Sequence, residues 1–390
     1  MLVSDRCSTL RKSNCSLSGN RHLGLTQETS PHARGFDYTF MFLSGCENRF
    51  NYEPQLDDPS HALFTPMNAG KFSMQDDKFF DQTNPKHAPR DFYSTTSFTD
   101  DSEQPFFAYL PFTIPHWQLH APREIIEKYK GMYDEGPYKL REKRLERLIE
   151  IDFIKPDGEL DNTFILFMSD NGADGAMLAA IPIMGDAGAV TKIIEKYYNN
   201  ELDNMGMADS YIWYGAEWAH ASSAPSRGYK TWITEGGIRC PCLIRYPPLH
   251  KANAKLVGGA ITDSFSTVMD VLPTTLDLAG GSGQAARRQL VAHLSGMQEG
   301  FHDEEKEITG WGLFGERAIR QGPWKAVRMF PPRGKDKWEF YNVKEDPEEL
   351  HDKAEQEKEV LEKLVRHLEV YYAETGMFDP GQEFEYTKYC

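Results

Sequence analysis

The sequence contains no apolar run long enough to span a membrane, and Met1–Ser18 lacks the apolar core of a signal peptide. Its six cysteines form no disulfide framework and no paired Cys-x-x-Cys arrangement. A basic excess is also missing, since 59 acidic residues outnumber 43 basic ones and give a formal net charge of −16. These absences argue against nucleic acid or a membrane as a partner. They predict reduced thiols and a cytoplasmic location.

The length of 390 residues is enough for two domains, or for one large α/β domain with an appendage. Apolar residues make up 40% of the chain, which is enough for a core, and charged residues make up 26%, which argues against disorder throughout. The composition shifts near residues 281–309, which resemble a surface linker. The sequence therefore predicts a large first part and a smaller second part.

The most informative segment is Phe164–Gly172, in which an apolar run is followed at once by Ser169, Asp170 and Asn171. Such a run predicts a parallel strand that is buried on both faces. Ligand sites in open α/β sheets lie just outside the carboxyl ends of strands. Asp170 and Asn171 would supply two oxygen ligands there for a hard cation, Ca²⁺ or Mg²⁺. The alternative is a strand that ends in an Asx-type turn.

Other segments of the first part predict both strands and helices. Phe106–Phe112 predicts a second buried strand, and Pro122 begins a short helix that runs to Lys130. Residues 138–151 predict a charged helix. Val268–Ala279 predicts a helix that is stopped by two glycines. This mixture predicts an α/β fold for the first part.

The second part predicts a small α+β subdomain. Trp324–Met329 and Trp338–Val343 predict the two strands of an antiparallel hairpin. Asp346 is expected to start a helix, and apolar residues at helical spacing over Leu361–Tyr372 mark its buried face. Gly376 is expected to end that helix.

Four polar segments stand in an informative order along the chain. They are Gly19-Asn20-Arg21-His22-Leu23-Gly24, Thr113-Ile114-Pro115-His116, Ser169-Asp170-Asn171-Gly172 and Tyr229-Lys230-Thr231-Trp232-Ile233-Thr234-Glu235-Gly236-Gly237-Ile238-Arg239. In order and content they resemble the sulfatase family, within the alkaline-phosphatase-like superfamily. Bacterial and fungal arylsulfatases are the members most similar in pattern, and their carboxy-terminal domain has a run like Gly315–Lys325. The resemblance extends over residues 22–375 with gaps.

The resemblance implies a large mixed, mostly parallel sheet flanked by helices, plus a small C-terminal antiparallel sheet with a helix. On this basis we expect an irregular lead-in at residues 1–20 and a sulfatase catalytic domain, incomplete, at residues 21–285. A C-terminal α+β subdomain is expected at residues 310–378, followed by a tail at residues 379–390.

The resemblance also implies roles for five residues. Asp170 and Asn171 match two ligands of the divalent cation, Ca²⁺ or Mg²⁺, which holds sulfate oxygens in the family. Lys230 matches the lysine that binds the sulfate and assists the leaving oxygen, and a lysine suits that task as a compact charge. His116 matches the histidine near the leaving group, where it would be the general acid. His22 matches the histidine that contacts the formylglycine hydroxyl.

Two structural departures from the family pattern stand out. The amino-terminal strand that ends in paired aspartates, which supply further cation ligands, has no counterpart in the sequence. A long helical segment expected between Arg147 and Leu160 is missing as well. We therefore expect a chain truncated at its amino terminus and a low affinity for Ca²⁺.

The chemical departures concern the nucleophile and the sulfate pocket. The formylglycine precursor motif is Cys or Ser, any residue, Pro or Ala, any residue, Arg. Cys7–Arg11 keeps only the Cys and the Arg of this motif and lies close to His22, whereas Ser223–Arg227 fits the motif but leads directly to Lys230. We interpret both as chance or structural matches. Asn20 replaces a sulfate-binding lysine.

The sequence thus predicts a sulfatase-family hydrolase that acts on small sulfate esters of the arylsulfatase type, with little or no activity in this chain because the formylglycine nucleophile is missing. Two alternatives remain open. One is a catalytically inactive sulfatase-like remnant, and the other is a related phosphodiesterase or phosphonate monoester hydrolase. The oligomeric state is not predicted.

Overall fold

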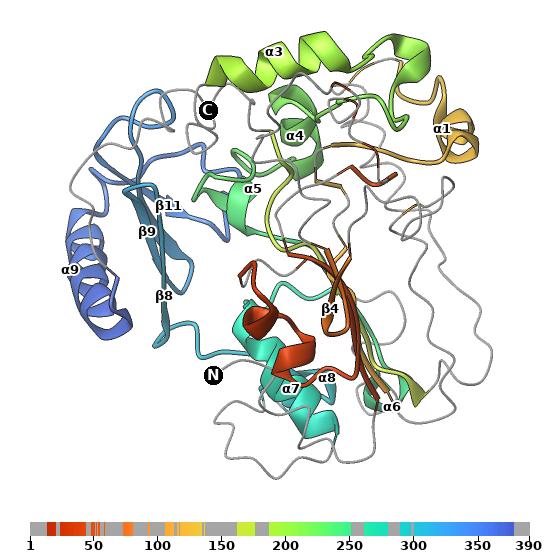
Figure 1. Cartoon of the computed structure of the whole chain (residues 1–390). Coiled ribbons are helices and arrows are strands. Elements are labelled where there is room, and N and C mark those ends of the chain that lie inside the picture. Colours follow the sequence, from red (N-terminus) through yellow and green to blue (C-terminus); the bar gives the residue numbers. More distant parts are fainter. Residues whose placement is uncertain are drawn as a thin grey trace. The chain divides into compact units, whose positions relative to one another are not determined.

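The structure is a computed structural model of the chain, shown in Figure 1. It describes residues 14–20, 24–43, 48–50, 52, 54, 58, 73–80, 93, 106–112, 115–116, 118–134, 136, 162–175, 187–250, 261–279, 289–297 and 300–377. The chain divides into two compact units. The first comprises Met1–Tyr133 and Ile181–Tyr214, and the second comprises Asp134–Ala180 and Gly215–Cys390. No helix in the described ranges has the length and apolarity needed to cross a membrane.

A five-stranded mixed sheet forms the centre of the first unit in its described part. The strand order is β4 (Lys78–Phe80), β3 (Ser73–Gln75), β2 (Tyr38–Phe42), β1 (Asn14–Asn20) and β5 (Phe106–Tyr109). Strand β1 pairs in parallel with β2 and with β5, whereas β2, β3 and β4 are joined by antiparallel pairings. The sheet therefore has parallel strands at one edge and antiparallel strands at the other.

Strand β1 is the largest departure from the predicted organisation of the first unit. Asn14–Asn20 was predicted to belong to an irregular lead-in, but it is an inner strand of the sheet. Cys15 and Leu17 alternate along it and are each 1% exposed, and they belong to one buried cluster with Met41 of β2 and Met74 of β3. The assignment failed because the strand has few apolar residues, and two inward-facing side chains are enough to bury it once partners exist on both sides.

The helices of the first unit are short. They are η2 (Gln27–Thr29), η3 (His32–Arg34), α1 (Arg123–Tyr129), α3 (Ala187–Tyr197) and η10 (Leu202–Asn204). The predicted helix at Pro122 is confirmed as α1, with Pro122 as the N-cap residue. Proline suits the start of a helix because its missing N–H has no intrahelical partner there. The charged helix predicted at residues 138–151 lies outside the described residues.

The second unit carries the strand that precedes Asp170, and here the prediction was wrong in part. Strand β6 (Ile165–Met168) exists, but it pairs in antiparallel fashion with β7 (Cys242–Arg245). Its side chains are also not all buried, since Phe167 is 61% exposed. An apolar run specifies a strand but does not specify the direction of its partner or which faces are covered.

Helices of the second unit precede its C-terminal sheet. They are α4 (Ala216–Ser223), α5 (Glu235–Ile238), α6 (Pro247–His250), η12 (Val268–Asp270), α7 (Val271–Leu278) and α8 (Gln289–Leu294). The interpretation of residues 281–309 as a surface linker was wrong, because they contain α8 and the buried side chain of His302. His302 Nε2 lies 2.9 Å from Asp270 Oδ2, and its Nδ1 lies 2.7 Å from Glu307 Oε2.

The C-terminal part of the second unit is a four-stranded antiparallel sheet with one long helix (Figure 1). Its strands are β8 (Ile308–Leu313), β9 (Glu316–Gln321), β10 (Trp324–Arg328) and β11 (Trp338–Asn342), and the helix is α9 (Lys358–Thr375). The predicted hairpin is confirmed as β10 and β11. The predicted class is also confirmed, since the chain has a mixed sheet with helices and a separate small antiparallel sheet with a helix.

Helix α9 covers one face of this sheet. Leu364 and Leu368 are buried against Ile319, Ala326 and Phe340 of the sheet. The helix ends at Gly376 in a left-handed conformation, as predicted. The predicted start was wrong, because the helix begins at residue 358. Asp346 instead accepts hydrogen bonds from the backbone N–H groups of Leu350 and His351, before the helix begins.

Candidate active site

The loop that follows β6 carries Asp170 and Asn171. Ser169 Oγ donates to the backbone carbonyl of Asn171 at 2.8 Å, which closes a tight turn. The Ser169 N–H donates to the carbonyl of Pro241 at 3.3 Å and so ties the start of this turn to the segment before β7. The turn presents two oxygen-bearing side chains side by side at the end of a strand.

The loop that carries Lys230 is bound to the turn by backbone hydrogen bonds. The N–H of Gly172 donates to the carbonyl of Gly237, and the N–H of Lys230 donates to the carbonyl of Ala173, both at 2.9 Å. Backbone bonds of this kind fix the register of two segments without depending on side-chain rotamers. The two motifs, which lie some sixty positions apart in the sequence, are therefore neighbours in the fold.

Glycine is required where the two loops approach most closely. A Cβ atom at position 172 would lie 1.9 Å from the carbonyl oxygen of Gly236, and a Cβ at position 236 would lie 2.3 Å from the oxygen of Gly228. Real Cβ atoms do not come so close to backbone oxygens. Gly172 of the DNG motif (Asp170-Asn171-Gly172) and Gly236 of the EGG motif (Glu235-Gly236-Gly237) thus have a steric explanation.

The ammonium group of Lys230 is held by a carboxylate from the other loop. Lys230 Nζ donates to Asp174 Oδ2 at 3.0 Å, and the two side chains are 27% and 11% exposed. A half-buried pair of this kind is screened less by solvent than a surface pair. Sequence inspection missed Asp174, although it lies four residues after Asp170 in the same motif.

Asp170 and Asn171 fit the role of cation ligands in the type of donor atom they carry. Within the part of the chain that the structure describes, their side chains form no hydrogen bond or ion pair, so their oxygens are available. The described part of the chain contains no group of three or more His, Cys, Asp or Glu side chains that could hold a metal. Two donors suit Ca²⁺ or Mg²⁺ in kind, but a hard cation takes six or more oxygens in total.

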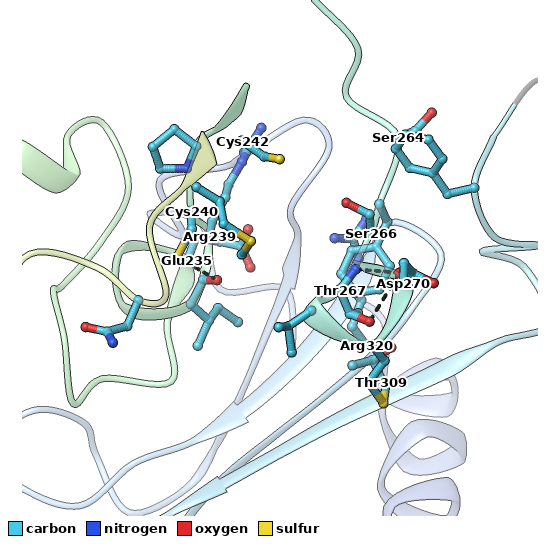
Figure 2. A pocket seen from close by; sticks show the side chains of 18 of the residues that line it. Glu235, Arg239, Cys240, Cys242, Ser264, Ser266, Thr267, Asp270, Thr309 and Arg320 are labelled. Carbon is cyan, nitrogen blue, oxygen red and sulfur yellow. Dashed lines mark hydrogen bonds between the residues drawn. The ribbon is translucent and has the colours of Figure 1, made fainter. Parts of the chain in front are cut away.

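A wide depression of about 2310 Å³ opens beside these loops, and Asp170, Asn171 and Lys230 all line it. Figure 2 shows the depression from close by, with Glu235, Arg239, Cys240 and Cys242 on one side. Its opposite side includes Ser266, Thr267, Asp270 and Arg320.

Cys240 is unsuited to act as a nucleophile in this depression. Burial, with a smaller contribution from the charge of Asp170, raises the pKa of the Cys240 thiol to about 11. Burial also raises the pKa of Cys242. The thiolate is the reactive form of cysteine, and at neutral pH these side chains carry their protons.

Buried charges lie behind the Lys230 loop. Lys325 Nζ, on β10, lies 2.9 Å from Glu235 Oε1 and 3.0 Å from Glu349 Oε1. Burial raises the pKa of Glu235, but the charge of Lys325 outweighs this effect and lowers it. Burial raises the pKa of Glu349, and Lys325 does not fully offset it. No local pattern in the sequence predicts these contacts, because the partners lie on distant segments.

The histidines that the sequence singled out are not part of the second unit. His116 lies in the first unit, and its backbone carbonyl accepts a hydrogen bond from Arg49 Nη2 at 2.8 Å. His22 lies outside the described residues. The convergence of His22 and His116 with the other three residues therefore stays a prediction.

The serine version of the nucleophile motif is used structurally. Arg227 Nη1 donates to Glu339 Oε2 at 2.8 Å, and the carbonyl of Arg227 accepts the Thr234 hydroxyl at 2.7 Å. Ser223 closes helix α4 and is not among the residues that line the depression. The interpretation of Ser223–Arg227 as a structural match stays a prediction. Cys7 lies outside the described residues.

Comparison with known proteins identifies the family. A family model described as Sulfatase matches residues 14–282. An uncharacterized sulfatase of Schizosaccharomyces pombe is 37% identical to this chain. The match covers 94% of this chain and 76% of that protein. An arylsulfatase of Klebsiella aerogenes is 27% identical, and the match covers 71% of this chain and 69% of that protein. The chain belongs to the sulfatase family.

Solved structures agree on the fold. The crystal structure of Ps i-CgsB in complex with k-i-k-neocarrahexaose gives a TM-score of 0.62 at 21% identity, and covers 95% of this chain and 73% of that one. The PsFucS1 sulfatase from Pseudoalteromonas sp. gives a TM-score of 0.55 at 15% identity, with 98% and 74% covered. At these identities the likeness concerns the fold alone.

Proposed function

We propose that Asp170, Asn171 and Lys230 form the cation- and sulfate-binding part of a site for small sulfate esters. Membership of the sulfatase family supports hydrolysis of sulfuric esters as the reaction type. The observation that carries the residue assignment is the backbone pairing of the two motif loops, which brings these side chains to one depression. The arylsulfatase type is proposed from the pattern of the motifs.

The chemistry asks for positive charge at the sulfate and for a proton at the leaving oxygen. In hydrolysis an oxygen derived from water adds to sulfur, the ester S–O bond breaks, and the leaving oxygen takes up a proton. The Lys230 ammonium would bind sulfate oxygens, and Asp174 would keep that ammonium in place. A divalent cation held by Asp170 and Asn171 would neutralise charge on the sulfate when bound. The role of His116 near the leaving oxygen, and that of His22 near the attacking hydroxyl, remain part of the proposal.

A catalytically inactive family member is the second candidate function. Support for it comes from Ser223, the serine of the one full motif match in the sequence, which does not line the depression beside Lys230. A protein of this kind would bind sulfate or a sulfate ester without turning it over. A phosphodiesterase or phosphonate monoester hydrolase would share the cation chemistry and differ in the ester it cleaves.

Two measurements on the full chain test the proposal. Calorimetric titration with sodium sulfate, in the presence of CaCl₂, should detect binding that Lys230→Ala abolishes and that Lys335→Ala leaves unchanged. Lys335 is an exposed lysine that does not line the depression. Hydrolysis of p-nitrophenyl sulfate, compared with bis(p-nitrophenyl) phosphate and a phenylphosphonate ester, then distinguishes the three activities. Absence of sulfate binding at millimolar concentrations, or binding that survives Lys230→Ala, would contradict the site.

A further inference from the structure

The residue that follows Lys230 has an unusual backbone conformation. Thr231 has a φ of +77°, in the left-handed region that β-branched residues rarely adopt. The carbonyl of Tyr229 accepts the N–H of Trp232 at 2.9 Å, so Lys230 and Thr231 are the central residues of a four-residue turn. A positive φ at the third position is what a type II turn requires, and glycine is the usual residue there. A non-glycine residue in this region costs about 1–3 kcal/mol and persists only when its surroundings enforce it.

Arg333, from the loop between β10 and β11, donates two hydrogen bonds to Thr231. Its Nη1 donates to the Thr231 carbonyl at 2.7 Å, and its Nη2 donates to the Thr231 hydroxyl at 2.9 Å. The Arg333 guanidinium also lies 5.3 Å from the centre of the Trp232 ring. A planar guanidinium with two donors on one residue fixes the orientation of that residue, which a single hydrogen bond does not do.

Arg333 is itself fixed by buried partners. Its Nη1 lies 3.3 Å from Glu316 Oε2, and both side chains are 0% exposed. Burial raises the pKa of Glu316 to about 7, with the charge of Arg333 opposing the rise. The carbonyl of Arg333 accepts a hydrogen bond from Arg227 Nη2 at 3.2 Å. The grip on Thr231 is therefore part of a packed polar network and not a contact between mobile side chains.

We propose that Arg333 is a positioning residue for Lys230. It holds Thr231 in the left-handed conformation, and this conformation directs the Lys230 side chain toward Asp174 and the depression. The proposal rests on the proposed function, which gives Lys230 its task at the sulfate. On this proposal, the loop between β10 and β11 supplies the group that sets the geometry of the site.

Substitution at Arg333 and Thr231 together tests this role. Arg333→Met removes both hydrogen bonds, so the turn relaxes and Lys230 leaves Asp174. Labelling of the Lys230 amine by acetic anhydride, followed by mass spectrometry, should become about tenfold faster, as expected for the release of strain of this size. Thr231→Gly removes the strain, because glycine adopts a positive φ freely. The double variant Thr231→Gly/Arg333→Met should therefore return to the wild-type labelling rate.

The matched control is Arg328→Met, which removes an arginine of the same hairpin. Arg328 pairs with Asp336 at 3.0 Å on the exposed side and touches neither Thr231 nor Lys230. In this variant, Lys230 should be labelled at the wild-type rate. If Arg333→Met does not fold, Arg333→Lys, which cannot donate two bonds in a plane, carries the comparison.

Two results would overturn the positioning role. One is a folded Arg333 variant whose Lys230 is labelled at the wild-type rate. The other is faster labelling that Thr231→Gly does not reverse, since a general loss of stability is not repaired by relief of strain at one turn. The labelling pattern is independent of sulfate binding. A wild-type protein that binds no sulfate but shows the expected pattern would sink the proposed function and leave the positioning of Lys230 in place.

Discussion

Lys325 Nζ lies 3.0 Å from Glu349 Oε1, and both side chains are 0% exposed. Glu349 also accepts the backbone N–H of Glu235 at 2.9 Å through its other oxygen, and Glu235 in turn pairs with Lys325. One ammonium group is thus shared by two carboxylates, one of which begins the EGG motif. The C-terminal sheet and the Lys230 loop are joined by charges that water does not reach.

Removal of the shared ammonium group should strongly destabilise the protein. We expect Lys325→Met to lower the free energy of unfolding by about 3–5 kcal/mol, because it leaves two carboxylates buried without a partner. Glu349→Gln in that background should recover part of the loss, since one of the two charges disappears. Urea denaturation followed by tryptophan fluorescence measures both values.

The control for this experiment is Lys344→Met, an exposed lysine just after β11. It should change the free energy of unfolding by less than about 0.5 kcal/mol. A Lys325→Met protein as stable as the wild type would show that the two carboxylates find other partners.

Gly172→Ala should separate the two loops of the candidate site. The new Cβ would lie 1.9 Å from the carbonyl oxygen of Gly236, so the hydrogen bond between Gly172 and Gly237 must break or lengthen. We expect a loss of about 2–4 kcal/mol together with weaker sulfate binding. Gly300→Ala is the matched control, because its Cβ would have no neighbour closer than 3.5 Å. Thermal unfolding monitored by circular dichroism compares the two, and equal melting temperatures would contradict the steric account.

Asp174→Asn should strengthen the binding of inorganic sulfate. The carboxylate of Asp174 lies 3.0 Å from Lys230 Nζ and competes with an incoming anion for the same ammonium group. We expect the affinity to rise about tenfold at low ionic strength, equivalent to about 1.4 kcal/mol. Asp263→Asn makes the same change of net charge at an exposed position of the same depression and should have a smaller effect. Equal effects of the two variants in calorimetric titrations would mean that only the overall charge matters.

His120 should make stability depend on pH in the acid range. Its Nδ1 accepts the Arg49 N–H and its Nε2 donates to the Ser210 carbonyl, so the imidazole is neutral. Burial, reinforced by the charge of Arg49, lowers the pKa of His120 from 6.5 to about 4. The unfolded chain therefore takes up this proton at a higher pH than the folded protein does. The contribution of His120 to stability is present above pH 6.5 and is lost as the pH falls toward 4.

Urea denaturation at a series of pH values tests this contribution. His120→Gln should flatten the loss of stability between pH 6.5 and 4, which for His120 alone is on the order of 3 kcal/mol. His351→Gln changes a histidine that is 76% exposed, and as the control it should flatten this loss much less than His120→Gln does. If the free energy of unfolding of His120→Gln fell with pH as steeply as that of the wild type, other groups would be responsible for the loss of stability.

Calcium should bind only weakly. Asp170 and Asn171 offer two oxygen donors, whereas Ca²⁺ takes six to eight. We expect a dissociation constant well above the micromolar range, raised further by Asp170→Ala and left unchanged by Asp263→Ala. Calorimetric titration with CaCl₂ measures both, and tight binding by the wild-type chain would mean that further oxygen ligands complete the site.

Several elements of the fold could be predicted because the deciding pattern is local. The alternation in Trp324–Met329 and Trp338–Val343 and the turn residues between them define a hairpin, which is present as β10 and β11. Leucines at helical spacing and the closing Gly376 define α9. Strand β1 and helix α8 were missed, because a short element with few apolar residues becomes stable only through its neighbours. The antiparallel pairing of β6 with β7 was not predicted either, because an apolar run does not specify the direction of its partner.

The sequence by itself determined the family motifs and, through them, the candidate residues Asp170, Asn171 and Lys230. Only the tertiary structure decided that Asp174 holds Lys230, that Arg333 grips Thr231 and that Lys325 joins two carboxylates. These contacts link segments that are dozens of residues apart, and no local pattern encodes them. Pairing of buried charges depends on which segments the folded chain brings within a few ångströms of each other, and that is a property of the packing.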